Sequence, residues 1–203
     1  MTNHLPELYR DRFIIVVDKP SGLPSQAPRG GGENVFAILS ERERYVGLHH
    51  RLDTPASGAL LLSLDERANK GLAEAFRAHT IERTYEVFVV GDPGESGSWR
   101  EPLDDKPAVT HWSRVEYRRG LSLLRVTLET GRTHQIRRHA AGAGFPIVGD
   151  RRYGGAAGRA HRRLALHASR LSLLHPVSGE RLEVAAPPHA DLARLYTMVG
   201  ASP

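Results

Sequence analysis

Residues 49–58 read HHRLDTPASG, and the apolar run ALLLSL follows at residues 59–64. The run predicts a buried strand, and the proline and glycine before it predict a turn. This turn carries Asp53 two residues after Arg51. A carboxylate in that setting can serve as a nucleophile or a general base, or it can cap the turn with the arginine as its surface partner. The pattern by itself favours the capping role.

A second polar motif, GRTHQIRRH, occupies residues 131–139. It follows a predicted strand over residues 121–129, and Thr133 or a neighbour predicts the start of a helix that runs to about Ala141. Free backbone N–H groups at a helix start favour anions, so the motif is compatible with phosphate binding. A solvated basic helix is the alternative.

The remaining segments predict an α+β fold with a mixed sheet and flanking helices. The predicted strands cover residues 13–17, 83–90, 164–174 and 181–185, and the predicted helices cover residues 35–40, 66–79 and 191–199. Residues 91–106 are rich in Gly, Pro, Ser and Asp and predict a loop or an irregular edge. No segment has the composition of a domain linker, so we expect one domain over residues 1–203.

Composition excludes several classes of protein. The 203 residues are 40% hydrophobic and 25% charged, as in ordinary globular proteins, and they include no cysteine. Disulfides, thiolate metal sites and a thiol nucleophile are therefore excluded. No apolar run approaches the roughly 18 residues of a membrane span, and the first residues lack the pattern of a signal peptide. The expectation is a soluble cytoplasmic protein.

The charge is basic and uneven. Lys plus Arg is 28 against 23 for Asp plus Glu, and lysine occurs only three times. Arginine suits phosphate and base recognition, although a genome rich in arginine codons would give the same excess. Residues 131–170 contain nine arginines and only one acidic residue, Asp150. This imbalance predicts a local basic surface. The nine are Arg132, Arg137, Arg138, Arg151, Arg152, Arg159, Arg162, Arg163 and Arg170.

Motifs for metals and nucleotide cofactors are missing. Eleven histidines occur, but their spacings include no HExxH. The glycines at residues 30–32 lack the GK[ST] that completes a phosphate-binding loop, and no GxGxxG opens a helix after a strand. We therefore expect neither a metal nor a nucleotide cofactor.

Five blocks, in order along nearly the whole chain, resemble the RluA family of RNA pseudouridine synthases. Two blocks are DKPSG at residues 18–22 and HRLD at residues 50–53 with the following SG. The others are RTY at residues 83–85, GRTHQIR at residues 131–137 with GFPIVGD at 144–150, and LHA at residues 166–168 with HPVSGE at 175–180. The departures are small: Ala56, Arg83 and Arg138 stand where the family usually has Thr, Lys and an apolar residue.

The resemblance implies isomerisation of uridine in RNA. Asp53 matches the essential carboxylate, which acts either as a nucleophile or as the base that starts glycosidic cleavage; the resemblance does not choose between these roles. Arg137 matches the arginine that pairs with this aspartate. Tyr85 matches the tyrosine that stacks on the target uracil and helps to remove its C5 proton. Strand packing for Tyr85 and phosphate contact for Arg137 are the alternatives.

Further residues would bind the substrate. Arg51 would occupy the space left when the target uridine flips out of the RNA, and Ile136 would form an apolar wall beside the uracil. The remaining predicted substrate-binding residues are His50, Arg132, His134 and Arg138.

The resemblance also implies a fold, a partner and a size. It implies a mixed, mostly antiparallel sheet divided by an RNA-binding cleft, in which Asp53 and Arg137 meet. The motifs start at about Tyr9, so no N-terminal S4 domain is expected, and RNA would be selected by the catalytic domain itself. Compact targets in tRNA or rRNA and a monomeric state are expected, with no cofactor. The alternatives are an RNA-binding protein without catalysis and a metal-dependent hydrolase.

Overall fold

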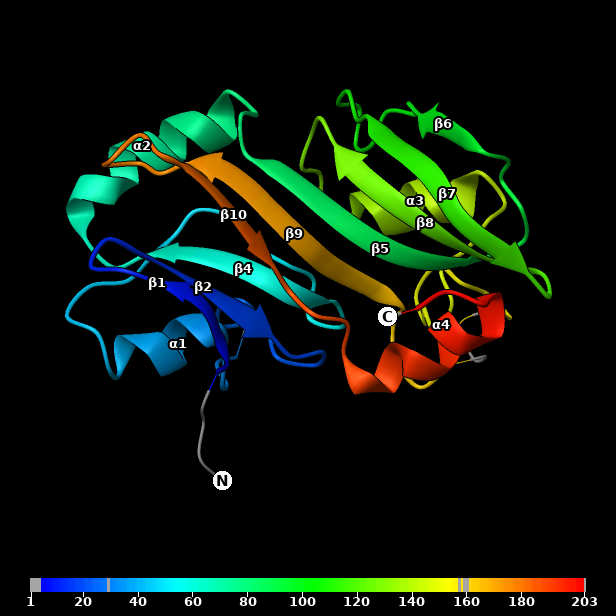
Figure 1. The fold of residues 1–203 in the computed structure, drawn as a ribbon, viewed down its shortest axis with the longest axis horizontal. Helices are drawn as coiled ribbons and strands as arrows, with labels where there is room; N and C mark the ends of the chain where they lie inside the picture. Colours follow the sequence, from blue (N-terminus) through cyan, green and yellow to red (C-terminus); the bar gives the residue numbers. More distant parts are fainter. Residues whose placement is uncertain (1–4, 29, 157, 159–160, 203) are drawn as a thin grey trace. The chain divides into compact units, whose positions relative to one another are not determined.

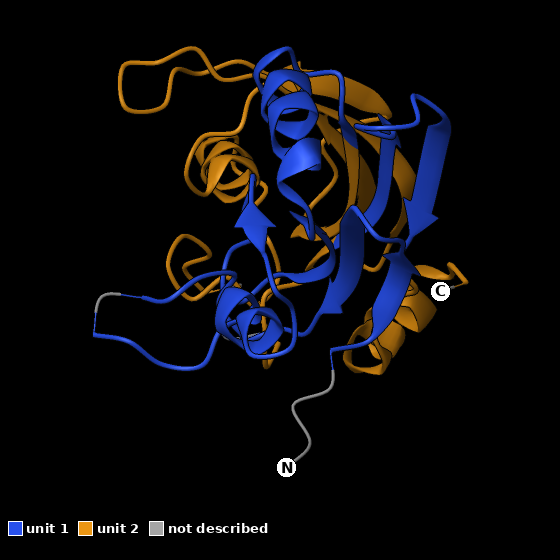
Figure 2. Ribbon diagram, turned by 90° about the vertical axis from the view of Figure 1, so that its left-hand side faces the viewer, with its two compact units in different colours: residues 1–82, 168–186 blue, residues 83–167, 187–203 orange. Residues whose placement is uncertain are grey.

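The computed structural model describes residues 5–28, 30–156, 158 and 161–202. The chain divides into two compact units, shown in different colours in Figure 2. Unit 1 holds residues 1–82 and 168–186, and unit 2 holds residues 83–167 and 187–203. The chain passes from one unit to the other at three places, two of which lie within strands.

Unit 1 contains six strands and two helices among the described residues. They are β1 (Glu7–Arg10), β2 (Ile14–Lys19), α1 (Val35–Ser40), β3 (Gly47–Leu48), β4 (Ser57–Ser63), α2 (Glu66–Arg77), β9 (Leu166–Leu174) and β10 (Arg181–Ala185). The strand order is β1-β2-β4-β9, with β10 paired to β9 and β3 paired to β4. The ladders of β1 with β2, β2 with β4 and β10 with β9 are antiparallel. Figure 1 shows β4 and β9 running in the same direction, so the sheet is mixed.

The core of unit 1 lies around β2 and β4, all of whose residues are buried. A strand covered on both faces needs apolar residues at successive positions, which explains the continuous runs IIVV and ALLL in place of an alternating pattern. Helix α2 is capped by Asp65, whose side chain accepts from the N–H of Arg67, and it buries Ala68 and Leu72. Burial of these residues against the sheet is the main source of stability in this unit.

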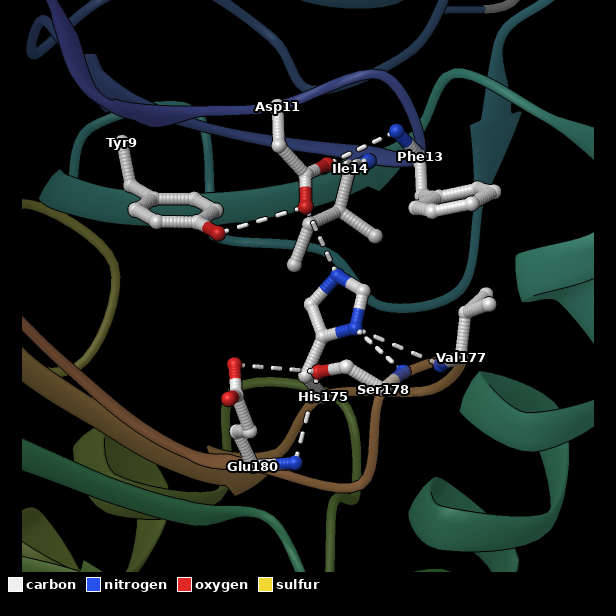
Figure 3. A network of polar contacts seen from close by, with 8 residues as sticks. All are labelled: Tyr9, Asp11, Phe13, Ile14, His175, Val177, Ser178 and Glu180. Atoms are coloured by element: carbon white, nitrogen blue, oxygen red, sulfur yellow. Dashed lines mark hydrogen bonds and ion pairs between the residues drawn. The ribbon is translucent and has the colours of Figure 1, made fainter.

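A polar network joins the β1–β2 turn to the β9–β10 turn (Figure 3). Asp11 accepts hydrogen bonds from the backbone N–H groups of Phe13 and Ile14, at 2.7 and 2.8 Å. Its Oδ2 lies 2.9 Å from Nε2 of His175, an ion-pair distance, although the alignment falls short of a hydrogen bond. The Nδ1 of His175 accepts from the N–H of Ser178 at 3.0 Å. These bonds account for Asp11 and His175 as structural groups.

Unit 2 contains three complete strands, nearly all of a fourth, β5, and two α-helices among the described residues; neighbouring strands are antiparallel. They are β5 (Glu82–Val90), β6 (Ser96–Trp99), β7 (Thr110–Arg118), β8 (Leu121–Leu128), α3 (Gln135–Gly142) and α4 (Ala193–Val199), with a short 3-10 turn, η2 (Ala190–Leu192), before α4. Glu82 belongs to unit 1, and the first two residues of β9 belong to unit 2. The strand order is β5-β8-β7-β6.

The predicted fold class is confirmed, and most predicted elements are present. The bounds of α1 and β10 agree with the predicted ranges. Three strands were not predicted: β1, β3 and β7. Strand β7 reads THWSRVEYR, and most of its residues beyond Trp112 are exposed, so its sequence lacks the apolar alternation that marks a strand. The segment 91–106, predicted as a loop or an irregular edge, contains the edge strand β6.

Candidate active site

Asp53 lies in a tight turn between β3 and β4, as its sequence context predicts. The N–H of Ala56 donates to the backbone oxygen of Asp53 at 3.0 Å, which closes the turn. Leu52 before it is buried, Arg51 is exposed and Asp53 is half-buried. The buried leucine anchors the turn in the core, so that the carboxylate is held at the surface of a rigid element and not on a mobile loop.

The buried side chain of Lys19 supports this turn. It is fully buried, and its Nζ donates to the backbone oxygens of Pro20, Leu23 and Thr54 at 2.9, 2.7 and 3.2 Å. An ammonium group has three N–H donors, so three carbonyl acceptors satisfy it. The N–H of Gly22 donates to the same Thr54 oxygen at 2.8 Å. The oxygen next to Asp53 in the chain is therefore fixed by two donors.

Two serines from the same segment add to this support. Ser21 Oγ donates to the backbone oxygen of Pro55 at 2.8 Å. Ser25 Oγ donates to the backbone oxygen of Leu52 and accepts from its N–H, both at 3.0 Å. Backbone groups on both sides of Asp53 thus bond to residues 19–25. The motif DKPSG identified this segment in the sequence. Only the hydrogen bonds show that the segment supports the turn around Asp53.

His50 makes its described contacts inside unit 1. Its Nε2 accepts from the N–H of Leu61 in β4 at 3.0 Å, and its ring stacks on Phe76 with 4.9 Å between centroids. The neighbouring His49 places Nε2 3.1 Å from Ser63 Oγ, and burial lowers the pKa of His49. These contacts give both rings a structural role, and substrate binding by His50 stays a prediction.

Tyr85 and Ile136 belong to unit 2 and are both buried, with 6% and 5% of their surface exposed. Tyr85 lies on β5, opposite Val126 of β8. Ile136 lies in the first turn of α3. The strand and the helix on which these residues were predicted are therefore present, and the contacts of both residues with the uracil stay predictions.

Arg137 is clamped by Asp150. Its Nε donates to Oδ2 and its Nη2 donates to Oδ1 of the carboxylate, each at 2.8 Å, and both side chains are buried. Oδ1 also accepts from the N–H groups of Arg152 and Tyr153 at 3.0 and 3.1 Å. Burial alone would raise the pKa of Asp150, but the bonds from Arg137 and the two N–H groups outweigh it and lower the pKa. Asp150 is therefore an ionised anchor.

The backbone before Asp150 is held as firmly as its carboxylate. The N–H of Val148 donates to the oxygen of Phe88 in β5, and its oxygen accepts from Ala165, each at 2.9 Å. Gly149 has a φ of +77°, and a Cβ there would stand 1.9 Å from the backbone oxygen of Arg163. Only glycine fits this close approach, which explains the glycine of the VGD sequence.

The remaining residues of the GRTHQIRR motif contact their own unit. His134 has a left-handed backbone, with φ 55° and ψ 30°, and its Nδ1 lies 2.9 Å from Tyr153 Oη. Arg132 Nε donates to the backbone oxygen of Pro107 at 3.1 Å. Gln135 closes the turn before the helix, because its Oε1 accepts from the N–H of Arg132 at 2.9 Å. Helix α3 begins at Gln135 with His134 at the N-cap position, which agrees with the prediction of Thr133 or a neighbour.

The surface that residues 131–170 were predicted to form carries less positive charge than its arginine count suggests. Asp104 binds both Nη atoms of Arg138, at 2.9 and 3.1 Å, and the hydrogen bond from Arg138 lowers the pKa of Asp104. Asp191 lies 2.8 Å from Arg163, which is nearly buried. Acids distant in sequence thus neutralise several of these arginines, while four are exposed: Arg151, Arg152, Arg162 and Arg170. Arg159 lies outside the described residues.

No group of three or more His, Cys, Asp or Glu side chains in the described part of the chain is arranged to hold a metal ion. No helix there is both long and apolar enough to cross a membrane.

Comparison with known proteins defines the family. Residues 13–142 match the family described as RNA pseudouridylate synthase. The ribosomal large subunit pseudouridine synthase D of Xanthomonas campestris is 37% identical over 224 residues, which cover 94% of this chain and 68% of the relative. The chain therefore belongs to the RNA pseudouridylate synthase family, and it is an isomerase that converts uridine in RNA to pseudouridine.

Other relatives agree in sequence and in fold. An uncharacterized RNA pseudouridine synthase of Zymomonas mobilis is 37% identical over 219 residues, which cover 95% of this chain and 96% of the relative. The solved structure of Human RNA Pseudouridylate Synthase Domain Containing 1 superposes with a TM-score of 0.79 at 24% identity, covering all of this chain and 97% of that one. At that identity the structural match supports the fold alone.

Proposed function

We propose that this isomerase acts on ribosomal RNA and that Asp53 is its catalytic carboxylate. The reaction breaks the C1′–N1 bond of uridine, turns the uracil and joins C1′ to C5, while C5 loses a proton and N1 gains one. The observation that carries the proposal is the support under Asp53: Lys19, Ser21 and Ser25 fix the backbone on both sides of the carboxylate. Such fixed geometry is what a reacting group needs.

Two residues of unit 2 complete the proposed catalytic set. Arg137 supplies a guanidinium whose orientation is set by Asp150, and Tyr85 supplies a ring for the uracil to stack on. A neighbouring guanidinium favours the ionised form of a carboxylate, which a nucleophile or base requires. We propose that both units form one catalytic domain, residues 1–203.

We assign the exposed Arg51 a role in base flipping. A uridine inside folded RNA must leave its stack before C1′ and C5 can be reached, at a cost of a few kcal/mol. We propose that the guanidinium of Arg51 stacks in the vacated space and offsets part of this cost. The proposal predicts that Arg51→Ala lowers activity most on paired target uridines and least on unpaired ones.

Ribosomal RNA is favoured over tRNA by the relatives. The Xanthomonas campestris and Yersinia pestis proteins, 37% and 33% identical to this chain, are named for the ribosomal large subunit. We further propose that the protein acts as a monomer, in the cytoplasm and without a nucleotide cofactor. Sedimentation tests the monomeric state. Turnover in a cofactor-free buffer that contains a chelator tests the independence from cofactors.

Release of tritium from uracil C5 tests the main proposal. We would incubate the protein with rRNA and, separately, with tRNA, each labelled at C5 and transcribed without modification. Asp53→Asn is expected to abolish release while RNA binding persists, and Glu74→Gln, the same change at an exposed carboxylate of α2, is expected to leave release unchanged. Full turnover by Asp53→Asn would refute the role of Asp53, and release from tRNA alone would refute the choice of rRNA.

A further inference from the structure

The end of the β7–β8 hairpin, residues 114–120, carries exposed aromatic and basic side chains. Strand β6 pairs with β7 only as far as Ser113, and the N–H of Arg114 donates to the oxygen of Glu95 at 2.7 Å. Beyond that point β7 continues past the end of β6 (Figure 1). Val115 and Tyr117 are 40% and 45% exposed there. The core of unit 2 does not require an exposed tyrosine at this position.

The turn at the hairpin end is built around an unfavourable residue. Arg119 and Gly120 have φ of 54° and 75°, and they connect Arg118 to its partner Leu121. Two central residues with positive φ make a type I′ turn, in which Asn, Asp or Gly is preferred at the first position. A long side chain in the left-handed region is disfavoured. Arg119 therefore has a backbone conformation that arginine does not favour. Residues held in such conformations cluster at functional sites.

The guanidinium of Arg119 is also available. Arg119 is exposed, and it forms no ion pair among the residues that the structure describes. Arg118, by contrast, places Nη1 beside Gly200 at the end of α4, and Arg114 is paired with Asp92 at 2.5 Å. The guanidinium of Arg114 also lies 5.8 Å from the ring of Tyr117. One uncommitted positive charge thus stands two residues from an exposed aromatic ring.

We propose that the hairpin end is a second RNA contact, separate from the target uridine. Arg119 binds a backbone phosphate, for which the guanidinium fork is suited, and Tyr117 stacks on an unpaired base. The proposal deepens the assignment of RNA as substrate and rests on it. The charged side chains at this edge, Arg118 and Glu116, disfavour the addition of a strand from another protein.

The variant Arg119→Asn separates binding from stability. Asn is preferred at the first position of a type I′ turn, so the variant should unfold at the same or a higher urea concentration. Loss of one phosphate contact should weaken RNA binding about tenfold. It should also reduce the slope of log affinity against log salt by about 0.7 to 0.9.

The variant Tyr117→Thr gives a different signature. Threonine suits an exposed strand, so the hairpin should persist, but the stacking surface is lost. We expect affinity for a single-stranded oligouridine to fall at least about fivefold, with the salt slope unchanged. Arg77→Asn, which removes an exposed charge at the end of α2, is the matched control for Arg119→Asn.

Fluorescence anisotropy with labelled oligouridine and with an rRNA transcript measures both effects on the full chain. The assay reads binding and not turnover, so failure of the Asp53 proposal would leave its outcome unaffected. Equal binding by wild type and both hairpin variants would overturn the inference. So would an equal loss in Arg119→Asn and Arg77→Asn, or a lower unfolding midpoint in Arg119→Asn. Loss of self-association on Tyr117→Thr with unchanged RNA binding would make this edge a protein contact instead.

Discussion

Replacing Asp150 with alanine should destabilise the protein strongly through the charge that it leaves behind. The carboxylate accepts two bonds of 2.8 Å from Arg137 and two more from backbone N–H groups. The two side chains are only 6% and 1% exposed, so the small energies of surface ion pairs do not apply. Breaking a buried pair by removing one partner costs about 3–5 kcal/mol.

That cost is a large part of the stability of a domain, which is about 5–15 kcal/mol. Most of it arises from the loss of the carboxylate that faces the buried guanidinium. In an Arg137→Met background the same Asp150→Ala change removes only the acceptor for two backbone N–H groups, and we expect about 1–2 kcal/mol. The double-mutant cycle should therefore show a coupling of about 2–3 kcal/mol.

Urea denaturation followed by circular dichroism measures all four proteins of the cycle. The pKa of Asp150 is lowered in the folded state, so its contribution is present above the unfolded value of about 4 and is lost as the pH falls through the folded value. The measurement should be made near pH 7. A cost below about 1 kcal/mol, or an equal cost in both backgrounds, would refute the clamp.

Three further predictions concern stability. Lys19→Met removes a donor from three backbone carbonyls, and those of Pro20 and Leu23 lose the bond without the second donor that Thr54 has in Gly22; it should cost about 3–5 kcal/mol in urea denaturation, whereas a loss below about 1 kcal/mol would contradict the role of the ammonium. Gly58→Ala places a methyl group 2.3 Å from the backbone oxygen of Ala168 at a φ of +107°, so a thermal scan should show a lower midpoint, and an unchanged midpoint would contradict the packing. Burial lowers the pKa of His49, so protonation favours the unfolded state; stability should decline as the pH falls below about 6.5, and His49→Gln should reduce that slope.

Local sequence patterns predicted most of the secondary structure. Helix α1 and strand β10 have the predicted bounds, and α2 begins at the predicted residue, Glu66. These features depend on residues within a few positions of each other, so they can be recognised in one sequence. Strand β7 could not be recognised in this way, because its pairing with β8 makes it a strand and its own residues show no apolar alternation.

The candidate site was predictable in its residues and not in its contacts. The motifs identified Asp53, Tyr85 and Arg137, but the support of Asp53 by Lys19 spans 35 residues to Thr54. Asp150 stood out only as the single acid of a basic stretch, and nothing in that stretch linked it to Arg137. The left-handed backbone of His134 was not predicted either, because a positive φ is uncommon in any residue other than glycine and is set by the surrounding structure.

The sequence by itself determined the family, the order of most elements and the side chains available for chemistry. The tertiary structure alone decided which groups are neutralised and which stay available. Arg137, Arg138 and Arg163 are paired with acids, while Arg119 is exposed and forms no ion pair among the described residues. The reason is physical: an ion pair depends on distance through space and on the loss of water around both charges, and neither quantity follows from separation along the chain.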